Sequence, residues 1–515
     1  MDGAALASSP EVRVTHELEL ILSTDVAAGE TLKVSAAAGA GKSTALRMYS
    51  AQRPQLQTLY LTFTTAEADA KAADYARRGF HHVTVSTLHA LAFSATTDLH
   101  GGQVAESLSL SAAYLARLTS TSSMDWPRAR RDEVCCVIGR FLASDAPDLC
   151  VSHLEAVSSD GRGLLGAAQA VWRAACNPDE QVTLTHDMYL KMCAVQPARR
   201  ARMFGEATLV LLDEAHDCTE AQIALAAAPA RTWGLVLVYD FFQRLYGWRH
   251  AATASYVRAL PAIAIRELTF SWRFGTALAK LASALLSRHT GATVVVQSSA
   301  THTTSILEVP LVPFVRVCGV GIELAVVART RRALFNTAMH ALASGAVGCI
   351  TFAHADSMFG SRDQLLDTYA LYVGRAQHDM LCPDQGAARF ADHGYAQYRR
   401  VAYTSRCQDA IEACEAVEKF GSALPQLLRK LDEALRASCS RSLVLLSVHE
   451  AKGREWAHVY LHPDLICSSN HTPNEQLYRL NLLYVAMTRA AAALYIPSAL
   501  VAFWFCRVGI NYRMC

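Results

Sequence analysis

Short apolar runs alternate with amphipathic stretches along much of the chain, and this alternation predicts parallel β-sheets flanked by helices. Runs that are apolar throughout predict strands covered on both faces, because helices pack on each side of a parallel sheet. Between two such runs, the Ala-rich stretch 66–78 predicts a helix. The strands expected in the first part of the chain are residues 32–37, 58–63, 82–85, 207–212 and 234–239.

A second alternation of the same kind follows in the later part of the chain. Its expected strands are residues 267–271, 324–328, 443–448 and 459–461. The apolar stretch 490–506 has the composition of a marginal membrane anchor. We interpret it instead as a buried strand at 491–496 followed by a docking segment at 500–505.

The strand pattern lapses twice, and each lapse predicts a mostly helical insertion. Because each half regains its strands after the lapse, two interrupted domains fit the 515 residues better than four consecutive domains. The predicted fold class is therefore α/β, with two parallel-sheet domains. The first covers residues 1–95 and 181–262 around an insertion at 96–180, and the second covers 263–350 and 441–515 around an insertion at 351–440.

The composition is that of a folded protein, and the charge limits the kind of polyanion site. Hydrophobic residues make up 52% of the chain and charged residues 18%, a balance typical of globular proteins. The 48 Lys and Arg nearly match the 46 Asp and Glu, which leaves a net charge of +2. Any site for a polyanion must therefore be a local groove rather than a basic coat.

The cysteines and the N-terminal segment indicate a cellular setting. The 15 Cys residues include no Cys-x-x-Cys pair, so we expect neither a zinc site nor an iron–sulfur cluster. Their odd number argues against a secreted disulfide framework, and residues 1–10 lack the basic and apolar segments of a signal peptide. We therefore expect an intracellular protein without a membrane segment.

Residues 32–44 combine a strand, a loop of small residues and a helix start, which is the pattern of a phosphate-binding P-loop. Backbone N–H groups in such a loop bind phosphate oxygens, Lys42 adds positive charge at the β- and γ-phosphates, and Ser43 offers a hydroxyl to Mg²⁺. The expected nucleotide-binding residues are Ala36, Ala37, Ala38, Gly39, Ala40, Gly41, Lys42, Ser43 and Thr44.

Two carboxylates, Asp213 and Glu214, directly follow the expected strand 207–212. We expect Asp213 to hold Mg²⁺ through water and Glu214 to activate the attacking water. The alternative is a solvated loop at the end of a buried strand. The P-loop in the same chain favours the catalytic interpretation.

Further motifs follow in a fixed order at residues 238–249, 271–274, 448–455 and 483–490. With these motifs the chain resembles superfamily 1 DNA helicases of the UvrD/Rep/PcrA group. Residues 87–90 and 185–191 look most like the F-box DNA helicases within that group. No F-box is evident ahead of the P-loop, so we do not expect assembly into a ubiquitin ligase.

The resemblance implies two RecA-like domains that bind ATP and Mg²⁺ in the cleft between them. It implies that Arg273 and Arg489 act in catalysis by contacting the γ-phosphate. It also implies that Gln243 senses the γ-phosphate and that Glu455 lies near the nucleotide ribose. Taken singly, such arginines are usually solvated or helix-capping residues, and Gln243 and Glu455 could be surface polar residues.

The resemblance also implies a binding surface for single-stranded DNA. Tyr246 and Trp248 lie two residues apart and share a face of an extended chain, where bases can stack. An aromatic pair buried in the core is the alternative for these two residues. The resemblance implies phosphate contacts for Thr87 and His89, and the other residues expected to bind DNA are Thr62 and His449.

The sequence departs from the family pattern at several of these motifs. His216 stands where the group usually has Gln, Tyr239 where it has Gly, and Thr64 where it has Asn. These positions bear on how the nucleotide state is coupled to DNA binding. Leu18 stands where the group usually carries a Gln that hydrogen-bonds adenine.

The sequence therefore predicts an ATP-dependent helicase or translocase that moves 3′ to 5′ on single-stranded DNA, with duplex or forked DNA as further candidate partners. The polarity follows from the resemblance alone. One alternative is an ATPase that strips proteins from single-stranded DNA without opening duplexes. Another is a scaffold with weakened hydrolysis that binds DNA or a partner. The likeness to F-box DNA helicases suggests the nucleus.

Overall fold

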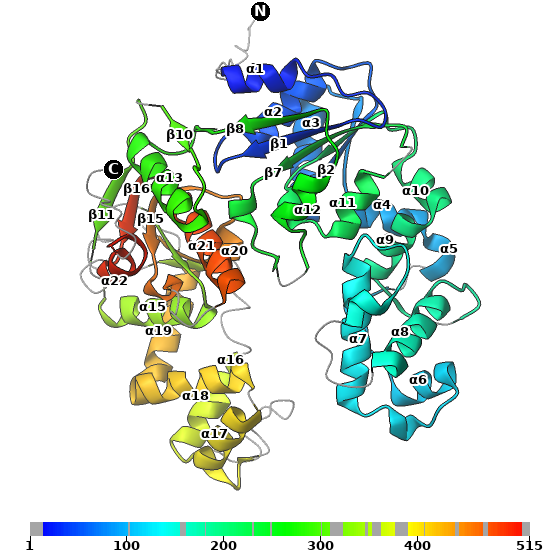
Figure 1. The fold of residues 1–515 in the computed structure, drawn as a ribbon. Coiled ribbons are helices and arrows are strands. Elements are labelled where there is room, and N and C mark those ends of the chain that lie inside the picture. Colours follow the sequence, from blue (N-terminus) through cyan, green and yellow to red (C-terminus); the bar gives the residue numbers. More distant parts are fainter. Residues whose placement is uncertain are drawn as a thin grey trace, which may run out of the picture. The chain divides into compact units, whose positions relative to one another are not determined.

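The computed structural model divides into two compact units, Met1–Thr269 and Phe270–Cys515. Figure 1 shows the helices and strands of each unit, and each unit is treated by itself below. The structure describes residues 14–100, 104–154, 161–180, 182–228, 231–247, 250–299, 301–309, 323–345, 349–352, 362–375, 390–405, 407–437, 442–466 and 472–506.

A six-stranded sheet in which every pairing is parallel forms the centre of the first unit. Its strands, in spatial order, are β3 (Val83–Thr87), β2 (Thr58–Thr62), β6 (Leu209–Leu212), β7 (Gly234–Tyr239), β1 (Thr31–Ala36) and β8 (Ala264–Leu268). Every residue of β2, β6 and β7 is buried, as the continuous apolar runs predict. All five strands expected in this part of the chain are present.

Successive residues of the central strands point to opposite faces and so enter two different cores. Leu209 and Leu211 of β6 pack with α1 (His16–Leu22) and α2 (Lys42–Ala51) on one face. Val210 and Leu212 pack on the other face with α4 (Leu88–Ala95), α9 (His186–Val195), α10 (Pro197–Phe204) and α11 (Glu220–Ala226). Helix α3 (Thr65–Arg77) contacts β2 and β3. Helix α12 (Ala254–Ala259) comes just before β8 in the sequence.

The insertion of the first unit has a hydrophobic core of its own. Its main helices are α6 (Ala112–Thr119), α7 (Arg128–Ala143) and α8 (Gly161–Ala175), with α5 (Thr97–His100), β4 (Val104–Ala105) and β5 (Leu184–Thr185) at its base. Helix α9 belongs to both cores, because Met188 and Met192 face the insertion while Leu190 and Cys193 face the sheet. The insertion core therefore extends past residue 180, where the sequence pattern placed its end.

The two units meet in the sequence at a different point from the predicted boundary between residues 262 and 263. The edge strand β8 pairs with β1, where Leu32 lies opposite Ala264, so residues 264–268 belong to the first unit. The expected strand 267–271 is in fact two pieces, the end of β8 and the short strand β9 (Phe270–Ser271) of the second unit. Alternating exposure along β8 hides this strand from a search for continuous apolar runs.

The second unit is also built on a parallel six-stranded sheet. Its strands, in spatial order, are β11 (Ser305–Glu308), β16 (Ala490–Ile496), β15 (Trp456–Leu461), β12 (Leu324–Ala328), β14 (Leu443–Ser447) and β13 (Ile350–Phe352). Helix α15 (Arg331–Ala343) packs on β12 and β14, whereas α21 (Pro473–Met487) contacts β15, β16 and α13 (Thr276–Thr290). Together with the first sheet, this confirms the α/β class with two parallel sheets.

The second insertion is smaller than its sequence range suggests. Helices α16 (Arg362–Tyr372), α17 (Gly394–Ser405) and α18 (Gln408–Phe420) share a small core that includes Leu371 and Tyr398. The core of the sheet also contains Val417 of α18, and α19 (Leu424–Arg436) places Leu427 and Leu431 there. The helix that ends the predicted insertion 351–440 therefore packs as part of the sheet domain.

The last described segment packs against the second unit. Strand β16 pairs with β15, and Leu500, Val501 and Trp504 are buried. The Trp504 indole Nε1 donates a hydrogen bond to the carbonyl of Leu465. These contacts match the expected docking segment. Within the described residues, no helix combines the length and apolar character needed to cross a membrane.

Candidate functional site

The loop between β1 and α2 is shaped for an anion. Gly39 and Gly41 adopt positive φ angles of 71° and 83°, which side chains other than glycine rarely tolerate. Gly41 is the N-cap of α2, so the first N–H groups of this helix face the loop, where negative charge is stabilised. Ala36, Ala38 and Ala40 are buried, and their small side chains leave the loop backbone close-packed.

The first turn of α2 brings the expected phosphate and metal residues to the two carboxylates after β6. Lys42 Nζ lies 3.8 Å from Glu214 Oε1. The Ser43 hydroxyl donates a hydrogen bond of 3.3 Å to Asp213 Oδ2, and Asp213 is only 2% exposed. Residues far apart in the sequence thus meet in one place within the first unit. A hydroxyl and a carboxylate are hard oxygen ligands, which suit Mg²⁺.

Glu214 has a strained backbone. Its φ of 54° and ψ of 37° place a residue other than glycine in the left-handed region. Such conformations cost roughly 1–3 kcal/mol and concentrate at functional sites. In this conformation Glu214 Oε1 lies 3.8 Å from Lys42 Nζ.

His216 lies behind this carboxylate, although the family usually has Gln there. The backbone N–H of Asp240 donates to His216 Nδ1 at 3.0 Å, so a neutral imidazole carries its hydrogen on Nε2. His216 Nε2 lies 3.1 Å from Glu214 Oε2. The histidine can therefore offer a donor to Glu214, as an amide would.

Gln243 joins the same buried group from the end of β7. Its side-chain Nε2 donates a hydrogen bond of 2.6 Å to Asp240 Oδ2. Burial raises the pKa of Asp240, and the positive charge of Lys42 opposes this shift. Gln243 is thus connected through Asp240 to His216 and Glu214.

Tyr60 and Lys71 complete the site and were missed from the sequence. The Tyr60 hydroxyl donates to Asp213 Oδ2 at 2.7 Å, and Lys71 Nζ lies 3.1 Å from the same oxygen. Burial, followed by the charge of Asp213, raises the pKa of Tyr60 well above its usual range, so this hydroxyl stays protonated. Tyr60 belongs to a buried strand and Lys71 to the helix after it, and no spacing signal connects either residue to residue 213.

In the second unit, Thr488 links the two expected arginines. Arg273 donates to the Thr488 carbonyl at 3.2 Å and to the Glu455 carboxylate at 2.8 Å. Arg489, with 1% exposure, donates from Nη2 to the Thr488 hydroxyl and from Nη1 to the carbonyl of Arg454. Arg273, Glu455 and Arg489 therefore form one cluster.

Among the expected DNA-binding residues, Thr62 and Thr87 face each other at the ends of β2 and β3. Both are buried, and their hydroxyls bond to nearby backbone groups: Thr62 donates to the Thr64 carbonyl, and Thr87 accepts from the N–H of Ala90. These two threonines therefore shape the turns after the strands. Because phosphate oxygens accept hydrogen bonds, a phosphate contact here would use the Thr87 hydroxyl hydrogen or a backbone N–H as the donor.

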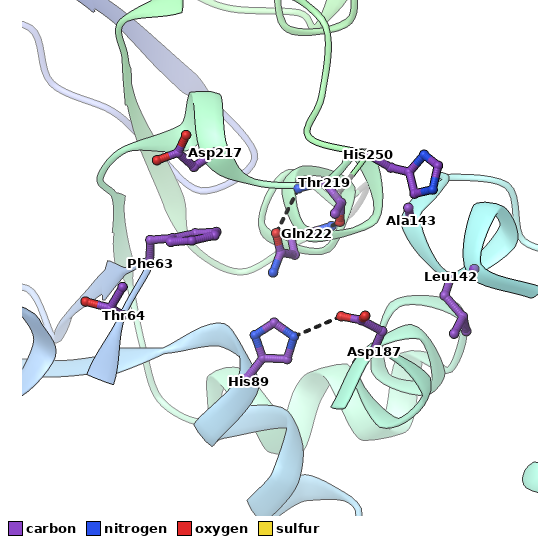
Figure 2. A pocket seen from close by; sticks show the side chains of 11 residues that line it. Phe63, Thr64, His89, Leu142, Ala143, Asp187, Asp217, Thr219, Gln222 and His250 are labelled. Atoms are coloured by element: carbon purple, nitrogen blue, oxygen red, sulfur yellow. Dashed lines mark hydrogen bonds and ion pairs between the residues drawn. The ribbon is translucent and has the colours of Figure 1, made fainter. Parts of the chain in front are cut away.

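His89 lines a cavity of about 300 Å³ in the first unit, shown in Figure 2. Its Nε2 lies 3.2 Å from Asp187 Oδ1, across the cavity from Thr64 and Gln222. Phe63 also lines this cavity, and its ring stacks on Tyr246 with a centroid distance of 5.2 Å. His89, Phe63 and Tyr246 thus come together along one side of the first unit.

The two other expected DNA-binding residues have different outcomes. Trp248 lies outside the described residues. His449 lies in the second unit on the short helix α20 (Val448–Ala451), and its Nε2 is 3.4 Å from the Tyr478 hydroxyl. Helix α20 begins with a capping box between Ser447 and Glu450, a spacing that is visible in the sequence. Across the described residues, no group of three or more His, Cys, Asp or Glu is arranged to hold a metal ion.

A parallel sheet whose first loop leads into a glycine-capped helix, with carboxylates at the end of a neighbouring strand, defines a P-loop nucleotide-binding protein. The model for the UvrD-like helicase C-terminal domain matches residues 442–496, a stretch that contains His449, Glu455 and Arg489. Together with the relatives described next, this match supports the resemblance of the chain to UvrD-like superfamily 1 helicases.

Two curated proteins are similar over 96% of this chain. One is F-box DNA helicase 1 of Gallus gallus, 24% identical over 527 aligned residues, and the match covers 50% of that protein. The other is F-box DNA helicase protein 1 of Schizosaccharomyces pombe, 25% identical over 543 residues, with 59% of that protein covered. The chain thus spans about half the length of the relatives it matches. The resemblance seen in the motifs is confirmed.

Proposed function

We propose that this protein hydrolyses ATP and moves 3′ to 5′ along single-stranded DNA, and that it opens duplex DNA in doing so. The observation that supports hydrolysis most is the meeting of Lys42, Ser43, Asp213 and Glu214 in the first unit. The similarity to DNA helicases supports the choice of DNA. The 3′ to 5′ direction rests on the motif at residues 246–249, and a nuclear location rests on the relatives.

The chemistry assigned to the first unit is phosphoryl transfer to water. The N–H groups at the start of α2 and the Lys42 ammonium bind the β- and γ-phosphates. The Ser43 hydroxyl would hold Mg²⁺, with Asp213 acting through water, and the ion, when bound, would neutralise charge on the phosphates. Glu214 orients the attacking water and accepts its proton, while His216 orients the Glu214 carboxylate.

The second unit contributes positive charge. We assign Arg273 and Arg489 to stabilising the negative charge that develops on the transferred phosphoryl group, because both match family residues with that role. Glu455 holds the Arg273 guanidinium at 2.8 Å and so limits its freedom before nucleotide arrives.

The DNA surface combines aromatic rings with histidines. We assign base stacking to Tyr246 and Trp248, and phosphate contacts to His89 and His449, with Thr62 and Thr87 shaping the groove. The stacked pair of Phe63 and Tyr246 supports this choice, since both residues are partly exposed instead of lying in the core, and Phe63 lines the cavity. Stacking on aromatic rings tolerates any base sequence.

Steady-state ATPase assays with and without single-stranded DNA test the proposal, followed by unwinding of partial duplexes with a 3′ or a 5′ tail. We expect DNA to stimulate hydrolysis and only the 3′-tailed duplex to open, with Lys42→Ala as the inactive control. Stimulated hydrolysis without unwinding would favour removal of proteins from DNA, an alternative consistent with the small core of α16, α17 and α18. DNA binding without hydrolysis would favour the scaffold alternative.

A further inference from the structure

The Lys71 ammonium occupies the position where the expected magnesium ligands meet. Its Nζ donates to the Ser43 hydroxyl at 2.7 Å, to the Tyr60 hydroxyl at 2.9 Å and to Asp213 Oδ2 at 3.1 Å. The same ammonium lies 4.8 Å from the centre of the Tyr60 ring. A lysine on α3 thus supplies the positive charge that balances the buried carboxylate of Asp213.

A metal ion bound to the Ser43 hydroxyl, and to Asp213 through water, would compete with this ammonium for the space between the two oxygens. Mg²⁺ requires its oxygen ligands at about 2.0–2.1 Å in near-octahedral geometry. Asp213 Oδ2 already accepts hydrogen bonds from Tyr60, Ser43 and Lys71. A divalent ion on Ser43 Oγ would also stand next to the Lys71 ammonium, where like charges repel. Binding of the metal therefore requires the ammonium to leave.

Lys71 can leave without disturbing the fold around it. Its side chain is 22% exposed, whereas Asp213 is 2% exposed, so the path of the ammonium leads toward solvent. Lysine has a flexible four-carbon stem and a compact charge that can be rehydrated. Glu67 lies one helical turn earlier on α3, four residues before Lys71, a spacing at which a carboxylate and an ammonium attract each other.

We propose that Lys71 is an internal competitor of Mg²⁺: it closes the metal site before nucleotide binds and is displaced by the metal that arrives with the triphosphate. This inference rests on the proposed function, since it concerns the same site. Lys71 acts through Ser43 and Asp213 and is a positioning residue. Because Lys71 competes for the site, metal alone binds weakly. Metal and nucleotide therefore enter together.

The test measures metal binding directly, without turnover. Mn²⁺ replaces Mg²⁺ as the probe, and the loss of its free electron paramagnetic resonance signal reports binding to the 515-residue chain without nucleotide. We expect Lys71→Met to bind one Mn²⁺ about tenfold more tightly than the parent, because a charge at this distance typically shifts ionic equilibria by a factor of ten or more. Arg77→Met removes a charge elsewhere on α3 and should match the parent.

A second titration follows a fluorescent ATP analogue as Mg²⁺ is raised. Lys71→Met should reach half-maximal binding at a lower Mg²⁺ concentration, with unchanged affinity for the analogue at saturating Mg²⁺. Lys71→Gln keeps a hydrogen-bonding end without the charge and replaces Lys71→Met if thermal melting shows that the latter is unfolded.

An unchanged Mn²⁺ affinity in the Lys71 variants would overturn the inference. A weaker affinity would also overturn it, and would mean that Lys71 supports the metal site instead of competing for it. If neither the parent nor the variants bind the ATP analogue, the proposed function fails, but the Mn²⁺ titration still decides the role of Lys71.

Discussion

The regions expected to act on nucleotide in the two units balance their charges in different ways. In the first unit, cations face anions: Lys71 lies against Asp213, and Lys42 against Glu214. In the second unit, the buried Arg489 is held by hydrogen bonds to backbone carbonyls and to a hydroxyl. The first region is thus built from ion pairs. In the second region, the Arg489 guanidinium donates hydrogen bonds to uncharged acceptors.

This difference indicates how each region responds to ligand. A triphosphate with its metal brings both signs of charge, so it can replace Glu214 as the partner of Lys42 and Lys71 as the partner of Asp213. Carbonyl groups hold Arg489 without neutralising it, so its positive charge stays available to a negative transition state. We therefore expect substitutions in the first region to change ligand binding and chemistry, and substitution of Arg489 to change folding as well.

The largest expected effect comes from substitutions in the first region. Lys42→Ala removes the phosphate charge, and Glu214→Gln removes the base while keeping the shape of the side chain. We expect both to abolish measurable ATP turnover, but Glu214→Gln should still bind ATP. Turnover and binding of a fluorescent ATP analogue are measured side by side. Hydrolysis at the parental rate in both variants would contradict the site assignment.

The next largest effect is expected from a substitution in the second region. Arg489→Ala should lower turnover by roughly several hundredfold or more, the scale of a lost arginine finger. It should also lower the free energy of unfolding by about 1–3 kcal/mol, because buried carbonyls lose their donor. Urea unfolding measures the change in stability and a separate ATPase assay measures the change in turnover, so the two effects can be told apart.

Arg273→Ala is the matched variant for that experiment. Its partner Glu455 is 62% exposed, exposed ion pairs contribute about 0–1 kcal/mol, and Arg273 donates to one carbonyl, that of Thr488. We therefore expect slow turnover with a smaller loss of unfolding free energy than in Arg489→Ala. If Arg489→Ala retains full turnover, Arg489 is a structural residue that anchors the end of α21.

How far the sequence predicts each region follows from the kind of signal it carries. The P-loop is local: Gly39, Gly41 and Lys42 are neighbours in the chain, and their roles in a strand-loop-helix turn follow from their spacing. The strands are also local, because burial on both faces requires an apolar run. These features were therefore visible before the structure.

Features that depend on two distant side chains were not visible. Nothing in the spacing indicates that Lys71 on α3 reaches Asp213 after β6, because helical periodicity shows only which residues lie on the exposed face. The burial of Arg489 was missed for a similar reason, since its acceptors come from the fold around the turn between α21 and β16. The sequence pattern did not assign β8 to the first unit, because exposed and partly buried residues alternate along this strand.

A smaller effect is expected at the proposed DNA surface, which extends the comparison beyond the residues that bind nucleotide. Trp248→Ala should weaken binding of single-stranded DNA by about 1–3 kcal/mol, the range for one base stacked on an aromatic ring. ATPase without DNA should change little. Tyr246→Phe, which keeps the ring stacked on Phe63, is the control. Circular dichroism that shows lost structure in Trp248→Ala would mean that this residue belongs to the core.

The smallest expected effect concerns how the first region recognises the nucleotide, by its phosphates or by its base. Leu18 stands where the family usually carries a Gln that hydrogen-bonds adenine, and it lies buried in α1 with 7% exposure and no side-chain hydrogen-bonding group. If recognition comes mainly from the opposed charges around Lys42 and Asp213, the base should matter little, and GTP or CTP should serve almost as well as ATP. Sites that hydrogen-bond a base reject unmatched bases strongly, whereas apolar contacts discriminate weakly. Measuring kcat/KM for the four nucleoside triphosphates tests this directly. A preference for ATP above about a hundredfold would mean that another polar side chain reads the base.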